Sequence, residues 1–426
     1  MANFLIRNGH VIDPANNVDE VMDILIEDRI ISKVGVGLKP TPTDVVINAE
    51  GELVLPGLVD MHVHLRQPGR EDKETIESGC QAAARGGVTS VCTMPNTQPV
   101  TDNRQVVEFI LAEAQKIDLI HIHPAAAITK GLEGKELTEI AELHSSGVVA
   151  ITDDGRSVMN AEIMRRAMEY AKMCGVVVVS HCEDLSLTEH GVMNEGLMAT
   201  RLGLRGMPNM SEAVMVAREI LLAELTGAHI HCTHISTKES VDLIRQAKGR
   251  GICVTCDVTP HHLTLTEEAV KGYDPNMKMN PPLRTVEDTE ALQQGLKDGV
   301  IGAIVTDHAP HTEADKDVEF DQAPFGVIGL ETSLGVVATE LVAKGKLSWK
   351  ELVLRMSTQP AEILGIPAGT LSPGRPADVI IVDPQKKWKV IPEEFRSKSR
   401  NSPFIGKELK GKVVTTICCG KIVYRE

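Results

Sequence analysis

The chain has 426 residues, of which 42% are hydrophobic, so it is long enough to bury a large core and is not generally disordered. Its formal net charge of -15 argues against a nucleic-acid or anionic membrane surface as the main partner, because phosphate groups are neutralised by clustered lysine and arginine. No apolar run approaches the length of a membrane span and the N-terminus does not resemble a secretory signal, so a cytoplasmic location is expected.

Both ends of the chain are rich in short alternating strands. Near the N-terminus they are FLIRNGHVID, MDILIEDRIISKVG and DVVINAEGELVLPG, and near the C-terminus PADVIIVDP, KWKVI and VVTTICCGKIVYRE. Asn-Gly, Asp-Arg and Gly turns between the N-terminal strands are typical of hairpins. Because neither piece can bury a face alone, we predict that residues 1–54 and 365–426 pair into one small β-sandwich domain.

Between the two ends, apolar strands alternate with helical segments. Helical patterns are clearest at 74–87, 160–173 and 211–227. Eight strands alternating with helices predict a (β/α)8 TIM barrel over 55–364, whereas an open doubly wound sheet usually has fewer strands and a Gly-rich first turn. The expected strands are 58–65, 90–97, 121–128, 148–155, 176–184, 229–237, 253–262 and 301–310.

Imidazole and carboxylate groups stand at the ends of five of these strands. In a barrel, the carboxyl ends of the strands converge on one pocket. Several desolvated ionisable groups in one pocket are costly unless something pairs them, and a metal ion does so. The residues are His62, His64, Asp153, Asp154, His181, His231, His234 and Asp307.

His62 and His64 are two residues apart on a strand, so both side chains project from one face and can bind one ion. Arg66 follows just beyond the strand end. It could hold an anionic group of a substrate beside the metal, or form a surface salt bridge with Glu71 or Asp72, and spacing alone leaves both readings open.

Imidazole and carboxylate donors without thiolate suit zinc, or less specifically manganese, cobalt or iron. Four His and two Asp exceed the needs of one catalytic zinc, so two ions are implied, with a carboxylate between them. Asp153 and Asp154 point to opposite sides of their strand, and only one can face the lumen. A hydroxide bridging two such ions is a nucleophile at neutral pH, because metal binding lowers the pKa of water to about 7.

Asp307, in TDHAPH, is the candidate acid-base group. The alternative is a strand-end cap for the following helix, but Asp307 lies in a polar cluster with His308 and His311. The pair Cys253 and Cys256 resembles a redox or zinc motif, yet three residues apart on a strand the two thiols face opposite sides. The cysteines are therefore interpreted as reduced, buried small hydrophobes.

Seven segments, taken together, resemble dihydroorotase of the bacterial long-chain type, within the amidohydrolase superfamily. They are DMHVHLRQPG, MPNT, ITDDG, SHCED, HCTHIST, KMNPPLR and TDHAPH, and the match spans nearly the whole chain. The resemblance implies that Asp307 is a metal ligand and the proton shuttle, that Asp154 is the bridging carboxylate, and that His231 is structural. The implied metal ligands are His62, His64, Asp154, His181, His234 and Asp307, and the implied substrate-binding residues are His64, Arg66, Asn96, Asn280, His311, Phe325 and Gly326.

The implied reaction is the reversible, zinc-dependent cyclisation of N-carbamoyl-L-aspartate to L-dihydroorotate, a step of pyrimidine synthesis, with two Zn2+ per chain. The long acidic segment 311–326 is expected either to cover the substrate or to be a solvated barrel loop. A homo-oligomer, expected to be a dimer, and association with aspartate transcarbamoylase are further expectations from the family.

Two other functions compete with this one. Dihydropyrimidinase, hydantoinase and allantoinase are related cyclic-amide hydrolases, but they rely on a carboxylated Lys, and no Lys lies between Lys135 and Lys172 here. A non-catalytic scaffold for a transcarbamoylase is the other alternative, and such chains typically lack metal ligands that this sequence retains.

Overall fold

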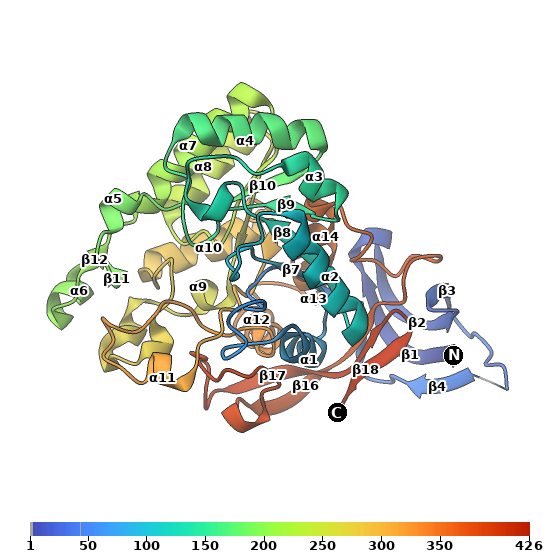
Figure 1. Cartoon of the computed structure of the whole chain (residues 1–426). Helices are drawn as coiled ribbons and strands as arrows, with labels where there is room; N and C mark the ends of the chain where they lie inside the picture. Colours follow the sequence, from blue (N-terminus) through green and yellow to red (C-terminus); the bar gives the residue numbers. More distant parts are fainter. Residues whose placement is uncertain (1–2, 43) are drawn as a thin grey trace.

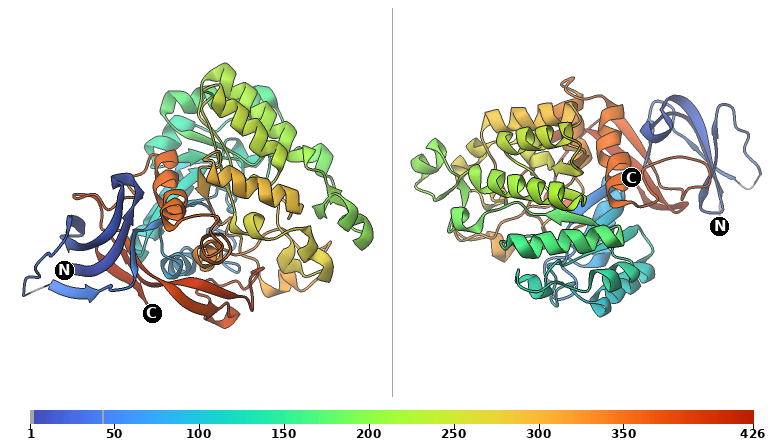
Figure 2. Two further views of the ribbon diagram at one scale, coloured as in Figure 1. Left: turned by 180° about the vertical axis from the view of Figure 1, so that it is seen from behind. Right: turned by 90° about the horizontal axis from the view of Figure 1, so that it is seen from above.

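The computed structural model describes residues 3–42 and 44–426 (Figure 1). It consists of a parallel barrel and a separate sheet that both chain ends build. Two further views show the sheet lying to one side of the barrel, with the N-terminal strands farthest from it (Figure 2). The candidate site residues named from the sequence therefore lie in the barrel, and the terminal sheet packs against the outside of the barrel.

Within the described residues, the barrel sheet has eight strands whose order in space follows the order in the chain. A parallel bridge between Val63 and His308 joins the two edges, and the amide of His64 donates to the carbonyl of His308 at 2.9 Å. All eight predicted strands are thus confirmed. They are β6 (Leu58–Val63), β7 (Val88–Thr93), β8 (His121–Ala126), β9 (Ala150–Ile151), β10 (Val177–Ser180), β13 (Ile230–Cys232), β14 (Val254–Val258) and β15 (Ala303–Ile304).

Helices between the strands cover the outside of the barrel, as the 3.6-residue periodicity predicts. The first begins at Thr75, whose side chain and that of Ser78 form a reciprocal cap, and ends at Gly87 in the left-handed conformation. The main helices are α1 (Ile76–Gly86), α2 (Arg104–Ile117), α3 (Ile140–Ser145), α4 (Ala161–Cys174), α7 (Met210–Thr226), α8 (Lys238–Gly249), α10 (Val286–Lys297) and α14 (Gln359–Leu364).

Shorter elements occupy the longer loops of the barrel. After β10 the chain makes an excursion, seen at the edge of Figure 1, that includes a small two-stranded sheet. These elements are α5 (Leu185–Thr188), β11 (Met193–Asn194), α6 (Leu197–Leu202), β12 (Gly206–Met207), α9 (Pro260–Thr264), α11 (Glu313–Lys316), α12 (Ser333–Val337) and α13 (Trp349–Val353).

The barrel interior is apolar at one end and polar at the other. Ala150, Val177 and Val179 belong to a buried apolar cluster inside it, which the last helix, α14, also contacts. Because alternate residues of a strand share a face, the same side of β9 leads from Ala150 to Asp154, and the same side of β10 leads from Val179 to His181. Strand alternation therefore carries these polar side chains to the carboxyl end of the lumen.

The terminal sheet hydrogen-bonds the two chain ends together, because β5 pairs antiparallel with β16. Its strand order is β18-β17-β16-β5-β1-β2-β3, with β4 pairing with β1, and it buries an apolar cluster of its own. The predicted association of the ends is confirmed, while domain boundaries at 54/55 and 364/365 stay predictions. The strands are β1 (Asn3–Asp13), β2 (Val18–Glu27), β3 (Ile30–Gly35), β4 (Asp44–Asn48), β5 (Leu53–Pro56), β16 (Val379–Lys389), β17 (Glu408–Cys418) and β18 (Lys421–Arg425).

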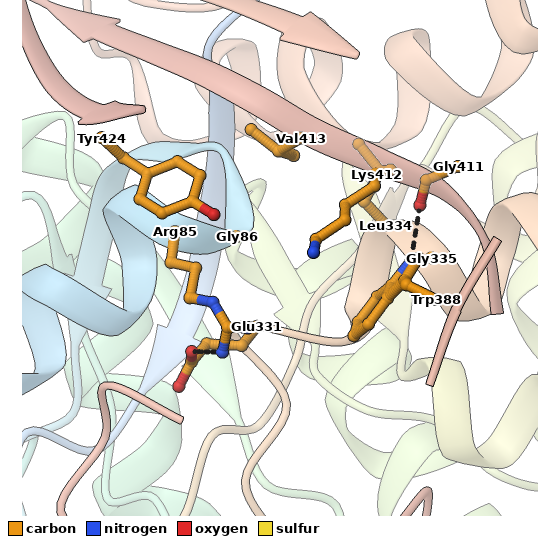
Figure 3. Close-up of a pocket in the computed structure, with 10 residues that line it drawn as sticks. All are labelled: Arg85, Gly86, Glu331, Leu334, Gly335, Trp388, Gly411, Lys412, Val413 and Tyr424. Atoms are coloured by element: carbon orange, nitrogen blue, oxygen red, sulfur yellow. Dashed lines mark hydrogen bonds and ion pairs between the residues drawn. The ribbon is translucent and has the colours of Figure 1, made fainter. Parts of the chain in front are cut away.

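Strand β17 contacts helices α1 and α12, and β18 also contacts α1, which joins the sheet to the barrel (Figure 3). A cavity of about 20 Å³ remains there. Arg85 pairs with Glu331 at 2.7 Å beside it, and the indole nitrogen of Trp388 donates to the carbonyl of Gly411 at 3.0 Å. Space for little more than one water molecule makes this cavity a packing feature and not a ligand site.

Candidate metal centre

Side chains from five barrel strands meet at the carboxyl end of the barrel. Nε2 of His62 lies 3.2 Å from Oδ1 of Asp154 and 3.5 Å from Oδ1 of Asp307. Nε2 of His64 lies 3.1 Å from the same Asp307 oxygen and 3.5 Å from Oδ2 of Asp154. The two carboxylates, separated by 153 positions in the sequence, therefore share both imidazoles of the β6 segment.

The remaining two imidazoles complete the cluster on the other side of Asp154. Nδ1 of His181 lies 3.0 Å from Nε2 of His234, and these atoms are 3.8 and 3.7 Å from Oδ1 of Asp154. All of these residues are buried. The structure thus brings together the six residues that the sequence singled out as ligands.

The outer nitrogens of three rings have oxygen partners, which fixes where the ring protons lie. Nδ1 of His62 is 2.8 Å from the Thr233 hydroxyl, which donates in turn to Asp257 at 3.0 Å. Nδ1 of His64 is 2.9 Å from the amide oxygen of Asn96. An acceptor at Nδ1 holds the proton there and leaves the lone pair of Nε2 directed into the cluster, as in histidine ligands of metals.

His181 uses the opposite nitrogen in the same way. Its Nε2 lies 2.8 Å from Oε2 of Glu183, which also accepts from the side-chain amide of Asn280 at 2.8 Å. The proton therefore belongs on Nε2, and Nδ1 faces His234 and Asp154 with its lone pair. Burial raises the pKa of Glu183, but the His181 ring outweighs this effect and brings the pKa to about 2.

Two buried atoms at the middle of the cluster, Nε2 of His62 and Oδ1 of Asp154, lie 3.2 Å apart but are not aligned for a hydrogen bond with each other or with another group. Burial lowers the pKa of His62, yet Asp154 and Asp307 together raise it to about 10. Burial likewise raises the pKa of Asp154, but His62, His234 and His64 hold it well below its usual range. The negative charge of the two carboxylates therefore favours a positive charge between these side chains. A metal ion can supply that charge, because metal ions and protons bind to the same nitrogen and oxygen lone pairs.

Two groups of possible metal ligands at the carboxyl end of the barrel have donor atoms close together, and the two groups share one residue. His62, His64 and Asp307 form one group, and His62, Asp154 and His234 form the other. Within each group the donor atoms all lie within 4.8 Å of one another. The donor set of nitrogen and oxygen without sulfur suits zinc and similar divalent ions.

The alternatives left open by the sequence can be compared with the geometry. Asp153 turns away from the lumen and accepts from the Thr129 amide at 3.0 Å, so Asp154 is the lumen-facing carboxylate. Asp307 caps no helix, because the cap of α11 is Thr312. His231 pairs with Asp257 at 2.8 Å, one layer below the cluster. Cys253 is exposed whereas Cys256 is buried, as expected for thiols on opposite sides, so the interpretation of the cysteines as buried small hydrophobes is wrong for Cys253.

A pocket of about 240 Å³ opens beside the metal cluster. Arg66 donates from Nε to the carbonyl of Pro310 at 3.2 Å, and within 3–42 and 44–426 no hydrogen bond or ion pair engages its terminal nitrogens. The expected alternative, a surface salt bridge, is absent from the described residues, since Asp72 pairs with Arg70. The lining includes His64, Arg66, Asn96, Asp154, His181, His234, Asn280, Asp307, His311, Phe325 and Gly326.

Burial lowers the pKa of Arg66 to about 10, against the opposing effect of Asp307 and Asp154, so the side chain still carries its charge at neutral pH. A desolvated guanidinium with free donors is a strong site for a carboxylate. The pocket therefore places a candidate metal-binding cluster beside a candidate anion-binding guanidinium.

The segment 311–326 forms one side of the pocket. Its Lys316 is buried and donates to the carbonyls of Pro324 and Pro275 at 2.8 and 3.0 Å, which anchors the segment. Nε2 of His311 lies 2.8 Å from the carbonyl of Phe325. Gly326 has a φ of 122°, and a Cβ there would meet the Cβ of Ala309 at 2.7 Å. Only glycine fits this backbone beside the pocket.

Sequence reasoning missed the residues that hold the ligands in place. Asp257 contacts Thr233, His231 and the amide of His234, and Glu183 contacts His181 and Asn280. Asp257 stands in the middle of a predicted strand, and a carboxylate inside an apolar strand was the available signal for it. Glu183 follows His181 by two positions, which puts it on the same side of the chain.

Comparison with known proteins identifies close relatives along the whole chain. Residues 51–240 match a family model described as dihydro-orotase-like. A dihydroorotase of Geobacter metallireducens is 51% identical over 423 residues, which is 99% of this chain and 100% of that protein. A dihydroorotase of Pelotomaculum thermopropionicum is 53% identical over 422 residues, covering 99% of this chain and 98% of that protein.

Solved structures with the same architecture come from related hydrolases. An L-hydantoinase (dihydropyrimidinase) from Arthrobacter aurescens matches with a TM-score of 0.89 and 27% identity, covering 100% of this chain and 96% of that one. A dihydropyrimidinase from Brevibacillus agri matches with a TM-score of 0.84 and 23% identity, over 99% of this chain and 95% of that one, and shows the fold alone. The predicted barrel with a separate sheet from the chain ends is confirmed by this likeness.

Proposed function

The chain belongs to the dihydroorotase family, and from this premise we propose that its barrel catalyses the reversible ring closure of N-carbamoyl-L-aspartate to L-dihydroorotate with loss of water. The chain is accordingly a cyclic amide hydrolase of pyrimidine synthesis. The observation that carries the proposal is the presence, in one pocket, of a metal-binding cluster and of the unpaired guanidinium of Arg66. A cyclic amide that bears a carboxylate needs both features.

We propose zinc as the metal, with two ions per chain. His62, His64 and Asp307 would hold one, and His181 and His234 would hold the other, with Asp154 between them. Bound metal ions would activate a water molecule and polarise the amide carbonyl. The proposal is supported by the bare nitrogen and oxygen lone pairs that face one another here without a hydrogen-bond partner.

The residues around the pocket have separate tasks in this proposal. Arg66 and Asn96 bind the substrate carboxylate, and the amide oxygen of Asn96 also orients His64 at 2.9 Å. His64, Asn280, His311 and the backbone of Phe325 and Gly326 position the ring. Fixed donors of this kind reduce the entropy that must be lost in reaching the reactive geometry.

Asp307 moves the proton. In the hydrolytic direction its carboxylate takes a proton from the attacking water and delivers it to the departing ring nitrogen. In the biosynthetic direction the same carboxylate removes a ureido proton. Burial raises the pKa of Asp307, but the imidazoles of His62, His64 and His234 hold it below its usual range, so the group is ionised and able to accept a proton at neutral pH.

The structural likeness to L-hydantoinase makes hydrolysis of an uncharged cyclic amide the second candidate. The two activities differ in the carboxylate that only dihydroorotate carries. Within the described residues the pocket offers Arg66 as a cation without a counter-ion, which a neutral substrate would leave desolvated and unpaired.

The test compares dihydroorotate and dihydrouracil as substrates for the zinc-loaded and the chelated enzyme. Chelation is expected to abolish ring opening and ring closure, and added zinc to restore both. Arg66→Ala should lower kcat/KM for dihydroorotate about 10- to 100-fold, since it removes a charge-assisted hydrogen bond, and should leave any weak turnover of dihydrouracil unchanged.

Arg70→Ala is the matched control, because Arg70 is a neighbouring guanidinium that pairs with Asp72 away from the pocket. If Arg66→Ala impaired dihydrouracil as severely as dihydroorotate, or if dihydrouracil were the better substrate of the unaltered enzyme, the assignment would be wrong.

Location and partners go beyond this test. No helix formed by residues 3–42 and 44–426 combines the length and the apolar character needed to cross a bilayer. A cytoplasmic location, a homodimer and association with aspartate transcarbamoylase stay predictions. Size measurement of the pure protein, with and without a transcarbamoylase, would test the last two.

A further inference from the structure

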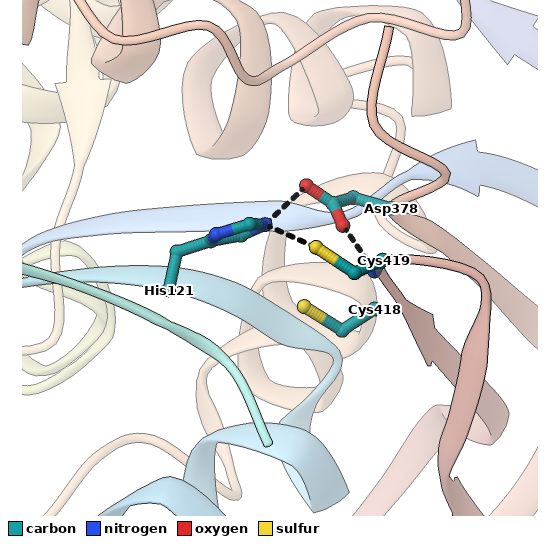
Figure 4. Close-up of side chains that lie close together, drawn as sticks. All are labelled: His121, Asp378, Cys418 and Cys419. Atoms are coloured by element: carbon teal, nitrogen blue, oxygen red, sulfur yellow. Dashed lines mark hydrogen bonds and ion pairs between the residues drawn. The ribbon is translucent and has the colours of Figure 1, made fainter. Parts of the chain in front are cut away.

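A second group of metal-ligating side chains lies at the opposite end of the barrel, where the terminal sheet meets the first residue of β8 (Figure 4). It consists of His121 at the start of β8, Asp378 just before β16, Cys418 at the end of β17 and Cys419 in the turn that follows β17. One donor atom from each lies within 4.8 Å of the others. The four residues form a set of two sulfurs, one nitrogen and one carboxylate.

The contacts within this set are short. Nε2 of His121 lies 3.0 Å from Oδ2 of Asp378 and 3.5 Å from Sγ of Cys419. Oδ1 of Asp378 accepts the amide of Cys419 at 2.8 Å, which fixes the carboxylate against the turn. Figure 4 shows both sulfur atoms on the side of the turn that faces His121.

The backbone of the turn is unusual for the residues that form it. Cys418 pairs with Lys421 across the hairpin, and the two residues between them, Cys419 and Gly420, have φ of 46° and 65°. Hairpin turns with two positive φ angles strongly favour Asn-Gly or Asp-Gly, and a cysteine in the first position is unfavourable. On an extended strand, adjacent side chains point to opposite faces, whereas this turn directs both thiols toward His121.

We propose that this cluster binds one Zn2+ ion through His121, Asp378, Cys418 and Cys419, and that the ion ties the barrel to the terminal sheet. Four protein ligands with two sulfurs are typical of closed, structural zinc sites. Binding displaces the two thiol protons to solvent and leaves thiolates on the metal. The site is independent of the rim cluster, which contains no sulfur.

The arrangement also leaves the cluster accessible to an ion. The side chain of His121 is 30% exposed, so an ion can enter from solvent. Arg29 donates to the carbonyl of Cys419 at 3.1 Å and holds the turn from the N-terminal strands.

A hydrogen-bonded Asp378–His121–Cys419 triad without a metal is the competing interpretation. It leaves Cys418 with a weak contact of 3.8 Å to the carbonyl of Thr89 and with the neighbouring Cys419 thiol as its partners. A metal ion accounts for both cysteines and for the backbone that brings them together.

Cobalt distinguishes the two ends of the barrel, because only a thiolate ligand gives an intense sulfur-to-cobalt charge-transfer band in the near ultraviolet. The full-length protein is stripped of metal, loaded with Co2+ and compared with Cys419→Ser and Cys418→Ser. The unaltered protein should show the band, and each variant, which keeps only one of the two thiols, should show about half of its intensity or less. Zinc-loaded Cys419→Ser should contain about one ion fewer per chain than the unaltered protein, at unchanged ring-opening activity.

Cys253→Ser is the control, since Cys253 is an exposed thiol outside the cluster. Alkylation of the unaltered protein gives a reading that depends on no variant: zinc should slow labelling of Cys419 and leave labelling of Cys253 unchanged. The proposal is overturned if cobalt-loaded protein lacks the band, if the band is undiminished in both serine variants, or if zinc does not protect Cys419. None of these readings depends on the reaction assigned to the rim.

Discussion

The carboxyl end of the barrel, called the rim here, and its amino end, called the base, each gather metal-ligating side chains, but they do so in different ways. At the rim, six residues from five strand segments meet, every donor is a buried nitrogen or oxygen, and five of the six residues line an open pocket. At the base, His121 comes from one strand and the other three residues come from the strands of the terminal sheet, with two sulfurs among the donors. An open position suits catalysis, whereas four closed protein ligands suit a structural tie.

The two ends of the barrel also differ in what holds the candidate ligands in position. Behind the rim ligands stand Thr233, Asp257 and Glu183, which set the ring protons of His62 and His181. At the base, the hairpin turn that contains Cys419, with its positive φ, holds the two cysteines in position. Substitution of a single side chain at the rim should therefore change the reaction rate, whereas a substitution at the base should change stability but not the rate.

The largest effect is expected from Asp307→Asn. An amide cannot accept the proton, so kcat should fall about 10²- to 10⁴-fold in both directions of the reaction. Initial rates with dihydroorotate and with carbamoyl aspartate measure this loss. Asp317→Asn, an exposed carboxylate on the segment 311–326, is the control. A variant that kept more than about a tenth of the activity would remove Asp307 from proton transfer.

His181→Ala and His234→Ala should each lower metal content and activity together, by about 10² or more in rate. His231→Ala, one layer deeper, should keep its rim metal and lose less than about tenfold in rate, because His231 contacts Asp257 and not the cluster. Elemental analysis and initial rates on the same samples check this. Loss of metal from His231→Ala alone would reverse the choice between His231 in β13 and His234 just after it.

A smaller, pH-dependent effect is expected at the segment over the rim. Burial lowers the pKa of Lys316 to about 7, with a further contribution from Lys278. Between about pH 7 and the unfolded value near 10.4, the unfolded chain binds a proton that the folded chain lacks, so the free energy of unfolding rises with pH, by up to about 1.4 kcal/mol per unit. Below pH 7 this gain is absent.

Lys316→Met removes the titration and keeps the length of the side chain. Chemical denaturation at several pH values should show the unaltered protein gaining stability relative to the variant as pH rises from about 7 to 10. Parallel pH profiles would mean that Lys316 keeps its proton in the folded protein.

The smallest effect is expected at the base. In the presence of zinc, Cys419→Ser should lower the midpoint of thermal unfolding by a few degrees, since it weakens one tie between barrel and sheet, and kcat should not change. Calorimetry beside a rate assay measures both. A fall in kcat without a change in the midpoint would mean that the two ends of the barrel are coupled.

The sequence allowed the barrel and the rim to be predicted because their signals are local. Each of the eight strands is an apolar run, and a polar residue at its carboxyl end must reach the rim whatever its neighbours are. Asp154 could be chosen over Asp153 only through the family resemblance, since spacing says that one faces inward but not which one.

Other features depend on contacts between segments far apart in the chain. Asp257 reaches His62 through Thr233, and no periodicity within a single strand encodes that chain of hydrogen bonds. The cysteines were interpreted as small buried hydrophobes, which suits Cys80 and Cys92 but overlooks the approach of Cys419 to His121 across 298 positions. The positive φ of Cys419 was also hidden, because Asn or Gly is the usual sign of such a turn.

The pairing of β5 with β16 means that the sheet at the chain ends cannot be completed until the last fifty or so residues have left the ribosome. The N-terminal strands must wait, partly unpaired, while the whole barrel is synthesised, and they are exposed to aggregation during that time. Completion of this sheet therefore reports that translation has reached the final hairpin, and a nascent chain cut short before β16 should be recognised by chaperones and proteases through its open edge.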